Sequence, residues 1–422
     1  MDGQKTDIAI IGGGAAGYFC AANLCRMLPG ADIRILESAA RPLAKVAVSG
    51  GGRCNLTNTF EDIGNLSEAY PRGYNLVKRL LGQFSPKDTA AWFTEAGVAL
   101  VEMEGGCIFP ASQDAMQIVR TLTRLARNAK LHTGTRVKNI SISESGNYII
   151  SADTSQGAAR FIATYVVVTT GGCGKGGYPH FLDSLGLEMV PPVPSLFSLE
   201  IRDDGLNALQ GLVCQGRVSI SGANASASGA ILITDWGLSG PAVLKASSYG
   251  AFHLAGHRYK GSLTVSWNGM SQTVAGTVVE ELSDCNPRKK VISTPAEGIP
   301  ARLWEHLAAR SGLRDDITWA ETGTRGRRRL AGAISADAYP LAGKCRFKDE
   351  FVTAGGISLS MVDIKTLECR SHKGLYFAGE ILDIDGITGG FNLQAAWSGG
   401  YVAALAIARK VQDSQKNTIL VE

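Results

Sequence analysis

The chain has 422 residues and a net charge of only +4, a length sufficient for two or three domains and a charge that gives no case for a nucleic-acid or anionic-membrane partner. Its nine Cys form no CxxC pair, its six His lack zinc-ligand spacing, and it shows neither a secretion-signal pattern nor an apolar run of about 18 residues. This composition predicts a soluble cytoplasmic protein with no membrane segment, no disulfide scaffold and no metal site.

The chain opens with the pattern of a βαβ unit. A short apolar strand is predicted over residues 7–11, an Ala-rich helix over 15–28 and a second strand over 32–37. Between the first strand and the helix, Gly12, Gly14 and Gly17 form the spacing Gly-x-Gly-x-x-Gly, which encloses Ala15 and Ala16. A strand before this spacing and a helix after it are the context in which it indicates dinucleotide binding.

Each part of this unit has a role in holding a dinucleotide. Gly12 permits the tight turn, Gly14 lets the backbone approach a pyrophosphate, and Gly17 lets helix and strand pack closely. The helix N-terminus supplies free N–H groups and positive partial charge for the phosphates. Glu37 can accept hydrogen bonds from ribose hydroxyls, and its charge disfavours a 2′-phosphate. The unit therefore predicts FAD or NAD rather than NADP, and the alternative is a glycine-rich turn without a ligand.

A second Gly-rich segment, KVAVSGGGRCNLTN over 45–58, is predicted to be a loop, and it favours FAD over NAD. An NAD domain does not need it, whereas an extended FAD needs backbone donors along its pyrophosphate and ribityl chain. Lys45 offers a point charge, and Arg53 offers a fixed fork of donors for a phosphate or a flavin carbonyl. The alternatives are a surface loop with a solvated Arg53 and, for Cys54, a small packed thiol rather than a redox partner.

The middle of the chain changes character twice. An amphipathic helix is predicted over 113–130, and strands follow at 132–138, 147–152 and 160–168. After the Pro-rich 191–194, short alternating strands predict a small antiparallel barrel or sandwich, at 196–201, 214–221, 229–234 and 261–267.

Next come two predicted helical stretches, near 272–283 and 299–311, and a basic run, Arg325–Arg329. After about residue 350 the α/β character returns, with a strand at 375–378 and a helix at 393–410. We therefore predict one nucleotide-binding domain interrupted by two insertions. The predicted ranges are 1–190 and 345–422 for the FAD domain, 191–269 and 333–344 for the β-barrel, and 270–332 for a small helical insert.

The C-terminal segment 374–400 supplies the other part of a flavin site. A strand ends at Gly379-Glu380, which puts a carboxylate beside a close backbone approach, as a ribityl hydroxyl requires. Gly389-Gly390 then opens a helix whose first N–H groups belong to Asn392 and Leu393. Such a helix N-terminus, aimed at the flavin N1/C2=O edge, stabilises the anion formed on two-electron reduction. The alternative is a buried C-terminal helix with a glycine cap.

Three segments resemble those of the BaiN-like flavoproteins, which are also described as aminoacetone-oxidase-type FAD enzymes. They are SGGGRCNLTN, TDWGLSGPAVL (234–244) and VTAGGISL…GLYFAGEILDIDGITGGFNLQAAWSGG (352–400). The similarity runs nearly end to end and keeps the order of the motifs. It implies an FAD-dependent oxidoreductase with a glutathione-reductase-type FAD-binding Rossmann-like domain, an inserted antiparallel β-barrel and a small helical subdomain.

The resemblance also implies roles for individual positions. The adenosine ribose would be held at Glu37 and the adenine at the backbone of Val137, with Thr170-Gly171-Gly172 closing over this side. Lys45 and the loop 49–55 would line the pyrophosphate–flavin region. The full set of expected FAD-binding residues is Gly12, Gly14, Ala15, Ala16, Gly17, Glu37, Ser38, Lys45, Ser49, Gly50, Gly52, Arg53, Cys54, Asn55, Val137, Thr170, Gly171, Gly172, Gly379, Glu380, Gly390, Asn392 and Leu393.

Two segments depart from the family pattern. The loop after Thr170 is shortened to GGCGKGGYPHF (171–181), and Asp235 stands where the family usually has His ahead of Gly-Leu-Ser-Gly-Pro. If that His contacts substrate in relatives, this chain acts on a different substrate or at a different pH. The catalytic residues stay unassigned. Asp235, Asp383 and Asp385 are candidates, although the last two are also typical turn-stabilising residues.

The leading prediction is flavin-dependent oxidation or reduction of a small organic substrate, with hydride transfer through FAD N5. NAD(P)H, as a transient reductant, or O₂ would close the cycle. One alternative is an RNA-modifying flavoprotein with Arg325–Arg329 as its footprint, although such runs are more often solvated faces. The other is a non-catalytic FAD-binding redox sensor or electron carrier. The substrate, the reductant, the acid/base group and the oligomeric state are left open.

Overall fold

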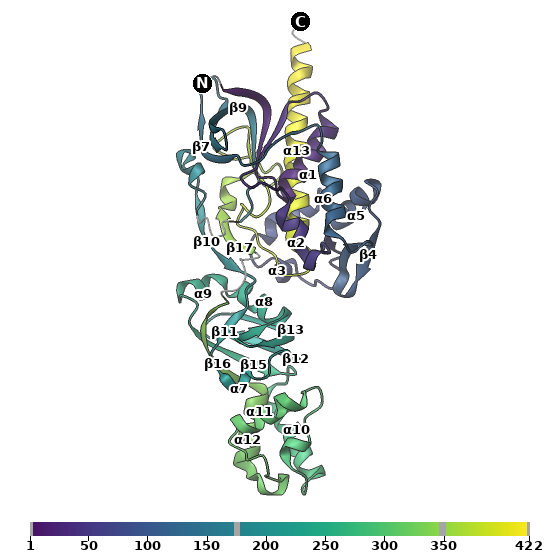
Figure 1. Cartoon of the computed structure of the whole chain (residues 1–422), viewed down its shortest axis with the longest axis vertical. Helices are drawn as coiled ribbons and strands as arrows, with labels where there is room; N and C mark the ends of the chain where they lie inside the picture. Colours follow the sequence, from purple (N-terminus) through teal and green to yellow (C-terminus); the bar gives the residue numbers. More distant parts are fainter. Residues whose placement is uncertain (1–2, 173–177, 346–351, 420–422) are drawn as a thin grey trace. The chain divides into compact units, whose positions relative to one another are not determined.

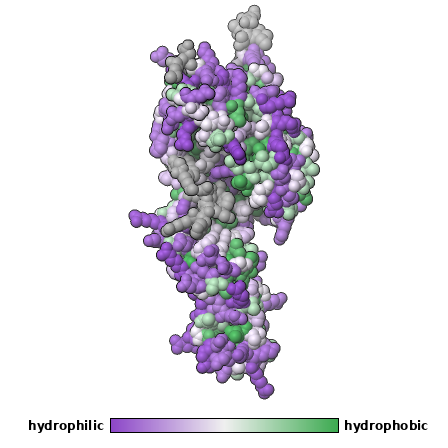
Figure 2. All heavy atoms as spheres, in the orientation of Figure 1, coloured by the Kyte–Doolittle hydropathy of each residue, from purple (hydrophilic) through white to green (hydrophobic). Residues whose placement is uncertain are grey.

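The computed structural model describes residues 3–172, 178–345 and 352–419 (Figure 1). Contacts divide the chain into two units. Unit 1 comprises Met1–Pro192 and Val352–Glu422, and unit 2 comprises Val193–Phe351. The visible face of both units is mainly hydrophilic with scattered apolar side chains (Figure 2). Unit 1 therefore contains residues from both ends of the sequence.

A seven-stranded sheet forms the centre of unit 1, in the order β6-β2-β1-β9-β8-β7, with β18 also paired to β9. β1 runs parallel to β2 and β9, so that Ile8 pairs with both Ile33 and Tyr165. β8 pairs antiparallel with both β7 and β9. The strands are β1 (Gln4–Ile11), β2 (Ile33–Leu36), β6 (Lys130–His132), β7 (Arg136–Ile142), β8 (Tyr148–Thr154), β9 (Gly157–Val168) and β18 (Leu375–Phe377).

Two long helices of unit 1, α1 and α13, pack side by side (Figure 1). α1 is buried from Ala16 to Cys25, as its continuous apolar sequence requires. Their close approach depends on Gly400, because a Cβ there would lie 2.7 Å from the carbonyl oxygen of Ala16. The helices of unit 1 are α1 (Ala15–Met27), α2 (Ala44–Gly52), α3 (Leu66–Ala69), α4 (Tyr74–Leu81), α5 (Pro86–Glu95), α6 (Ala115–Leu125) and α13 (Phe391–Ile419).

Two smaller sheets complete the strands of this part of the chain. One has the order β3-β5-β4, and the other pairs β10 with β17. Their bounds are β3 (Thr57–Asn58), β4 (Leu100–Met103), β5 (Cys107–Pro110), β10 (Met189–Ser195) and β17 (Val352–Ile357).

Two local predictions for unit 1 are wrong. The segment 45–58 is not one loop, because it contains α2 and β3. α2 loses helical geometry at Ser49, Gly50 and Gly51, so the glycines end a helix rather than form an open loop. The strand predicted over 132–138 is two strands, since the chain turns at Gly134 (φ +60°) between β6 and β7.

Unit 2 is built around a closed antiparallel barrel in the order β11-β14-β13-β12-β15-β16. β12 alternates between exposed and buried positions, as a barrel strand with one solvent-facing side should. The barrel strands are β11 (Leu199–Ile201), β12 (Val213–Ile220), β13 (Ala225–Thr234), β14 (Gly237–Ser239), β15 (Gly261–Trp267) and β16 (Asp337–Lys344). The predicted mixed α/β fold class with an antiparallel barrel is confirmed.

The helices of unit 2 share one core with the barrel. Trp304, Trp319 and Leu330 belong to the same buried cluster as Trp267 of β15. The helices are α7 (Asp204–Asn207), α8 (Pro241–Tyr249), α9 (Ala251–Gly256), α10 (Gln272–Cys285), α11 (Ala301–Arg310) and α12 (Gly323–Ser335).

A buried carboxylate ties the helices to the barrel. Asp337, only 3% exposed at the start of β16, accepts hydrogen bonds from Trp267 Nε1 (3.0 Å), Arg310 Nε (2.9 Å) and the Tyr339 hydroxyl. Arg310 also pairs with Asp203 at 2.8 Å. His306 lies beside the Tyr339 hydroxyl, and its burial lowers the pKa of its imidazole, so the imidazole is neutral at pH 7. Asp337 is therefore the anion on which this group of polar side chains converges.

Replacing Asp337 by Ala should destabilise unit 2, because Arg310, Trp267 and Tyr339 would lose their common acceptor. We expect a loss of about 3 kcal/mol in unfolding free energy and a fall on the order of 10 °C in Tm, measured by differential scanning calorimetry. Asp316→Ala is the control, since Asp316 pairs with Arg314 on the surface and both side chains are more than half exposed. Equal Tm values for the two variants would contradict this account.

Candidate functional site

The turn between β1 and α1 has the geometry of a dinucleotide-binding loop. Gly12 has φ +105°, and a Cβ there would lie 2.5 Å from the carbonyl oxygen of Thr169. A Cβ on Gly17 would lie 2.1 Å from the carbonyl oxygen of Gly12, so helix and strand meet without room for a side chain. Gly14 differs, because no described atom lies within 4 Å of a Cβ built there. Its open side is where a phosphate can approach the start of α1.

Glu37 directly follows β2, with its carboxylate directed back at this turn. Its Oε2 accepts a hydrogen bond from the Gly13 N–H at 2.6 Å, and its Oε1 accepts one from the Ala39 N–H at 2.7 Å. A carboxylate has about four lone-pair positions, so acceptor capacity remains for a ribose hydroxyl. The two N–H bonds hold the carboxylate in one orientation.

A cavity of about 400 Å³ opens beside Glu37. The expected residues Gly12, Glu37, Ser38, Val137 and Thr170 all line it. The sequence did not predict its other lining residues, which are Ile11, Leu36, Thr135, Arg136, Lys138, Tyr178, Pro179, His180 and Phe181. Of the shortened loop 171–181, residues 173–177 lie outside the described residues. The cavity has the size of a small-ligand site and suits an adenosine group.

The end of α2 contains a second group of the residues expected to bind FAD. Ser49 Oγ donates to the Val46 carbonyl, and the following Gly50, Gly51 and Gly52 all have positive φ. Arg53 donates through Nε to the Gly50 carbonyl and lies over the Phe109 ring at 5.0 Å. The terminal guanidinium nitrogens of Arg53 therefore keep donors that a ligand could use.

Cys54 and Asn55 follow directly in this segment. Cys54 is fully buried with φ +62°, and burial raises the pKa of its thiol to about 11. Its thiol is therefore protonated at neutral pH, as in a packed structural cysteine. Asn55 Oδ1 is buried and has no hydrogen-bond partner among the described residues. A buried acceptor of this kind normally has a partner, and a ligand donor would supply one.

Glu380 connects three separate segments of unit 1. Its Oε2 accepts from the Gly172 N–H and pairs with Lys45 Nζ, both at 3.1 Å, and its Oε1 accepts from the Thr353 N–H at 2.8 Å. The neighbouring Gly379 has φ +79°, and a Cβ there would lie 3.0 Å from the Cβ of Ala16. Thr353 was not predicted, because nothing in its local sequence indicates this contact.

The first turn of α13 has backbone N–H groups without an intrahelical partner. The first intrahelical bond runs from the Gln394 N–H to the Gly390 carbonyl, so the N–H groups of residues 391–393 precede the hydrogen-bonded part of the helix. The Asn392 side chain bonds both the N–H and the carbonyl of Gly386, at 2.8 and 2.7 Å. The Asn392 side chain is thus occupied, and the backbone N–H groups of residues 391–393 are left for a ligand.

The two ends of the site have a defined separation. Ala16, at the start of α1, contacts α13 at Gly400, which is nine positions beyond Phe391. Nine residues of α-helix span about 14 Å. The start of α1, where a phosphate can approach, and the N-terminus of α13 are therefore held apart along one helix. An extended FAD, with its pyrophosphate at one end and its ring at the other, fits these residues.

The candidate acid/base groups lie in different surroundings. Asp385 is fully buried and forms a two-point ion pair with Arg72 Nε and Nη2. Asp383 accepts a hydrogen bond from the Gly355 N–H at 3.1 Å, and burial raises its pKa, with the nearby Asp385 charge acting in the same direction. Asp235 lies in the exposed turn between β13 and β14 of unit 2. Their catalytic roles stay predictions.

This chain is similar to known proteins over almost its whole length. Residues 6–406 match the family model described as HI0933-like protein Rossmann domain. The 3-dehydro-bile acid delta(4,6)-reductase of Clostridium scindens is 30% identical over 418 residues, which cover 96% of this chain and 99% of that protein. The ribosomal RNA dihydrouridine synthase of Escherichia coli is 28% identical over 414 residues, covering 95% and 98%.

Solved structures share the fold at low sequence identity. The 3-ketosteroid-delta4-(5alpha)-dehydrogenase of Rhodococcus jostii has a TM-score of 0.50 at 13% identity, covering 96% of this chain and 97% of that one. The 3-ketosteroid delta1-dehydrogenase of Sterolibacterium denitrificans has a TM-score of 0.51 at 14% identity, covering 96% and 100%. Among the described residues, no helix is both long and apolar enough to traverse a bilayer. Nor do three or more His, Cys, Asp or Glu of the described ranges gather as a metal site.

Gly14→Ala should separate cofactor binding from folding. The new methyl group meets no described protein atom, but it occupies the side from which a pyrophosphate would approach. We expect an unchanged Tm for the apoprotein and an FAD Kd raised roughly tenfold or more, measured by titration of flavin absorbance. Gly30→Ala is the matched control, since its Cβ also meets no described atom. If Gly14→Ala bound FAD as tightly as Gly30→Ala, the phosphate would not lie at this turn.

Asp383→Asn should stabilise the protein in a pH-dependent way. The folded pKa of Asp383 is raised above its unfolded value, so its contribution to stability is greatest at low pH and is lost as pH rises through the folded pKa. At neutral pH the variant, which avoids burying a charge and keeps an acceptor for Gly355, should have the higher Tm. The Tm difference should shrink as pH falls towards 4, measured by differential scanning fluorimetry. A difference independent of pH would exclude titration of Asp383 as its cause.

Proposed function

The chain belongs to the HI0933-like family of FAD-binding Rossmann proteins, and on that premise we propose that it reduces a carbon–carbon double bond conjugated to a carbonyl group in a small organic substrate. It is an FAD-dependent oxidoreductase, and bound FAD supplies two-electron hydride chemistry. The substrate class and the direction of the reaction are the parts proposed here.

The observation that carries the proposal is the chemistry shared by the named relatives. A delta(4,6)-reductase of a 3-dehydro bile acid saturates double bonds in conjugation with a 3-oxo group. A dihydrouridine synthase saturates the ring double bond of uracil, which is also conjugated to a carbonyl. Relatives with different substrates thus share one type of bond, and that common bond is what we assign to this chain.

The residues of unit 1 support this assignment by what they can hold. The turn at Gly14 and the first N–H groups of α1 would bind the pyrophosphate, with Glu37 at the adenosine ribose and Glu380 near the ribityl chain. The backbone N–H groups of Asn392 and Leu393, at the positive end of α13, would hold the ring and favour negative charge on it. Asp383, with its raised pKa, is the acidic group in this loop best suited to exchange a proton.

A ribosomal RNA substrate is the second candidate, because two relatives of nearly full coverage carry that activity in their names. The basic run of α12 is its possible contact surface. Arg325, Arg328 and Arg329 are exposed, whereas Arg327 is paired with Glu280 at 2.8 Å. Three exposed arginines on one helix are also compatible with an ordinary solvated face, so we place the small organic substrate first.

The test is anaerobic reoxidation of the flavin. Holoenzyme is reduced with stoichiometric dithionite, and 4-androstene-3,17-dione is added as a conjugated 3-oxo substrate while absorbance near 450 nm is followed. We expect the oxidised flavin spectrum to return and a saturated ketone product to form. 5α-Androstane-3,17-dione, which lacks the double bond, is the control and should leave the flavin reduced.

Two outcomes would redirect the proposal. If conjugated ketones leave the flavin reduced and a uridine-containing ribosomal RNA fragment reoxidises it, the RNA candidate replaces the lead. In that case an Arg325→Gln/Arg328→Gln variant should weaken RNA binding and reduce its salt dependence. If neither acceptor reoxidises the flavin, reduction of a conjugated double bond is wrong.

A further inference from the structure

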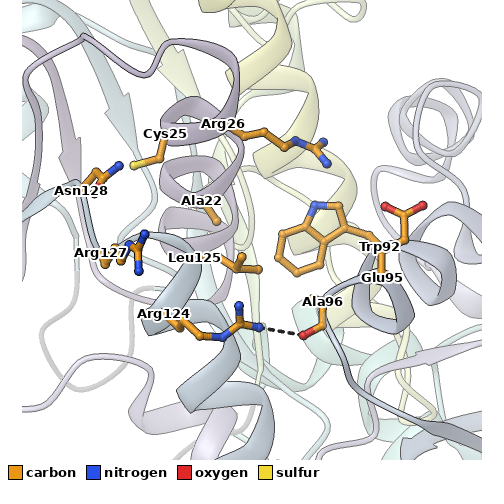
Figure 3. Close-up of a pocket in the computed structure, with 10 residues that line it drawn as sticks. All are labelled: Ala22, Cys25, Arg26, Trp92, Glu95, Ala96, Arg124, Leu125, Arg127 and Asn128. Atoms are coloured by element: carbon orange, nitrogen blue, oxygen red, sulfur yellow. Dashed lines mark hydrogen bonds between the residues drawn. The ribbon is translucent and has the colours of Figure 1, made fainter.

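A second cavity of unit 1, of about 410 Å³, lies where three helices end (Figure 3). The last turns of α1, α5 and α6 all contribute to it. Its lining residues are Ala22, Cys25, Arg26, Trp92, Glu95, Ala96, Arg124, Leu125, Arg127 and Asn128. None of them belongs to the expected FAD site, so this cavity is separate from the chemistry proposed above.

Three guanidinium groups stand around the cavity, and they are not equally available. Arg124 donates through Nη2 to the Ala96 carbonyl at 2.7 Å and so caps the end of α5 (Figure 3). Arg26 makes one contact, from Nη2 to Asn23 Oδ1 at 3.2 Å. Arg127 makes no hydrogen bond or ion pair with any described residue. Arg26 and Arg127 therefore keep most of their donors for a ligand.

Trp92 gives the cavity an apolar wall. The residue is 8% exposed, and its indole packs on Phe19 with ring centroids 4.4 Å apart. Its Nε1 donates to Asn23 Oδ1 at 3.2 Å, so the ring offers surface rather than a donor. In the view of Figure 3 the indole lies between Arg26 and Arg124, with Leu125 on the side towards Arg127. A flat apolar group could pack here beneath the arginines.

The charge balance decides how negative a ligand this cavity accepts. Three arginines face a single carboxylate, that of Glu95. Each of the three helix C-termini adds a partial charge of about −0.5, so the sum is close to +0.5 rather than +2. A polyphosphate would meet too little positive charge here. A ligand with one negative charge and an apolar body matches both the field and the wall.

We propose that this cavity is a second ligand site, which binds a small organic monoanion such as a ring-bearing carboxylate. Arg26 and Arg127 hold the carboxylate, and Trp92 and Leu125 contact the ring. The proposal does not depend on the reaction at the flavin, because the two sites share no residue.

The test uses 1-naphthoate as the anion and 1-naphthamide as its neutral counterpart, titrated into FAD-loaded protein by isothermal titration calorimetry. We expect 1-naphthoate to bind wild-type protein with a measurable Kd. Arg26→Gln/Arg127→Gln should raise that Kd at least tenfold while leaving the weaker 1-naphthamide binding unchanged. Arg124 is kept, because its loss would uncap α5.

Arg120→Gln is the matched control on α6, since Arg120 pairs with the exposed Asp114 at 2.9 Å and does not line the cavity. It should leave both titrations unchanged, and the Tm of each variant reports whether it is folded. The proposal is overturned if wild-type protein does not bind 1-naphthoate, or if the double variant binds it with the wild-type Kd. Equal losses for the acid and the amide would also overturn it, because charge would then play no part.

Discussion

The close approach of α1 and α13 at Ala16 is the constraint on which the rest of unit 1 depends. Gly400 and Gly379 both face this alanine, and a side chain on either would collide with it or crowd it. Because the C-terminal segment must seat on the first helix, the loop 379–390 is fixed to residues 55–58 as well. Asn58 Nδ2 donates to the Gly389 carbonyl at 3.1 Å, and Trp397 Nε1 donates to the Leu56 carbonyl at 2.9 Å.

The same constraint explains what the sequence could predict. The glycine turn between β1 and α1 was predictable because strand, glycines and helix follow one another without a break over residues 7–28, and their spacing alone indicates dinucleotide binding. The Arg72–Asp385 pair was not, since its partners are 313 positions apart and each looks ordinary in its own segment. The cavity beside Glu37 likewise gathers side chains from four segments. The assignment of individual FAD contacts stays a prediction.

Secondary structure was missed or misassigned where a residue occurs in an element that its type normally disfavours, or where an element is too short to show a pattern. β16 lies in 333–344, which was assigned to the barrel, but no strand was predicted there; it contains Pro340, and a proline normally argues against a strand. β14 has only three residues, too few for a periodic signal. In 45–58 the glycines suggested a loop, but the preceding residues Ala44–Val48 are good enough helix formers to make a short helix before the glycines end it.

Cys54 lies in the middle of the expected cofactor segment, and its surroundings bear on the durability of the protein. A reduced flavin that meets O₂ releases hydrogen peroxide, and the thiolate form of cysteine is the form that attacks peroxide and is oxidised by it. Cys54 has no exposed surface, and its raised pKa keeps the sulfur protonated. Cys54 is thus chemically quiet, and side reaction of a reduced flavin with oxygen need not oxidise this residue of the expected cofactor segment.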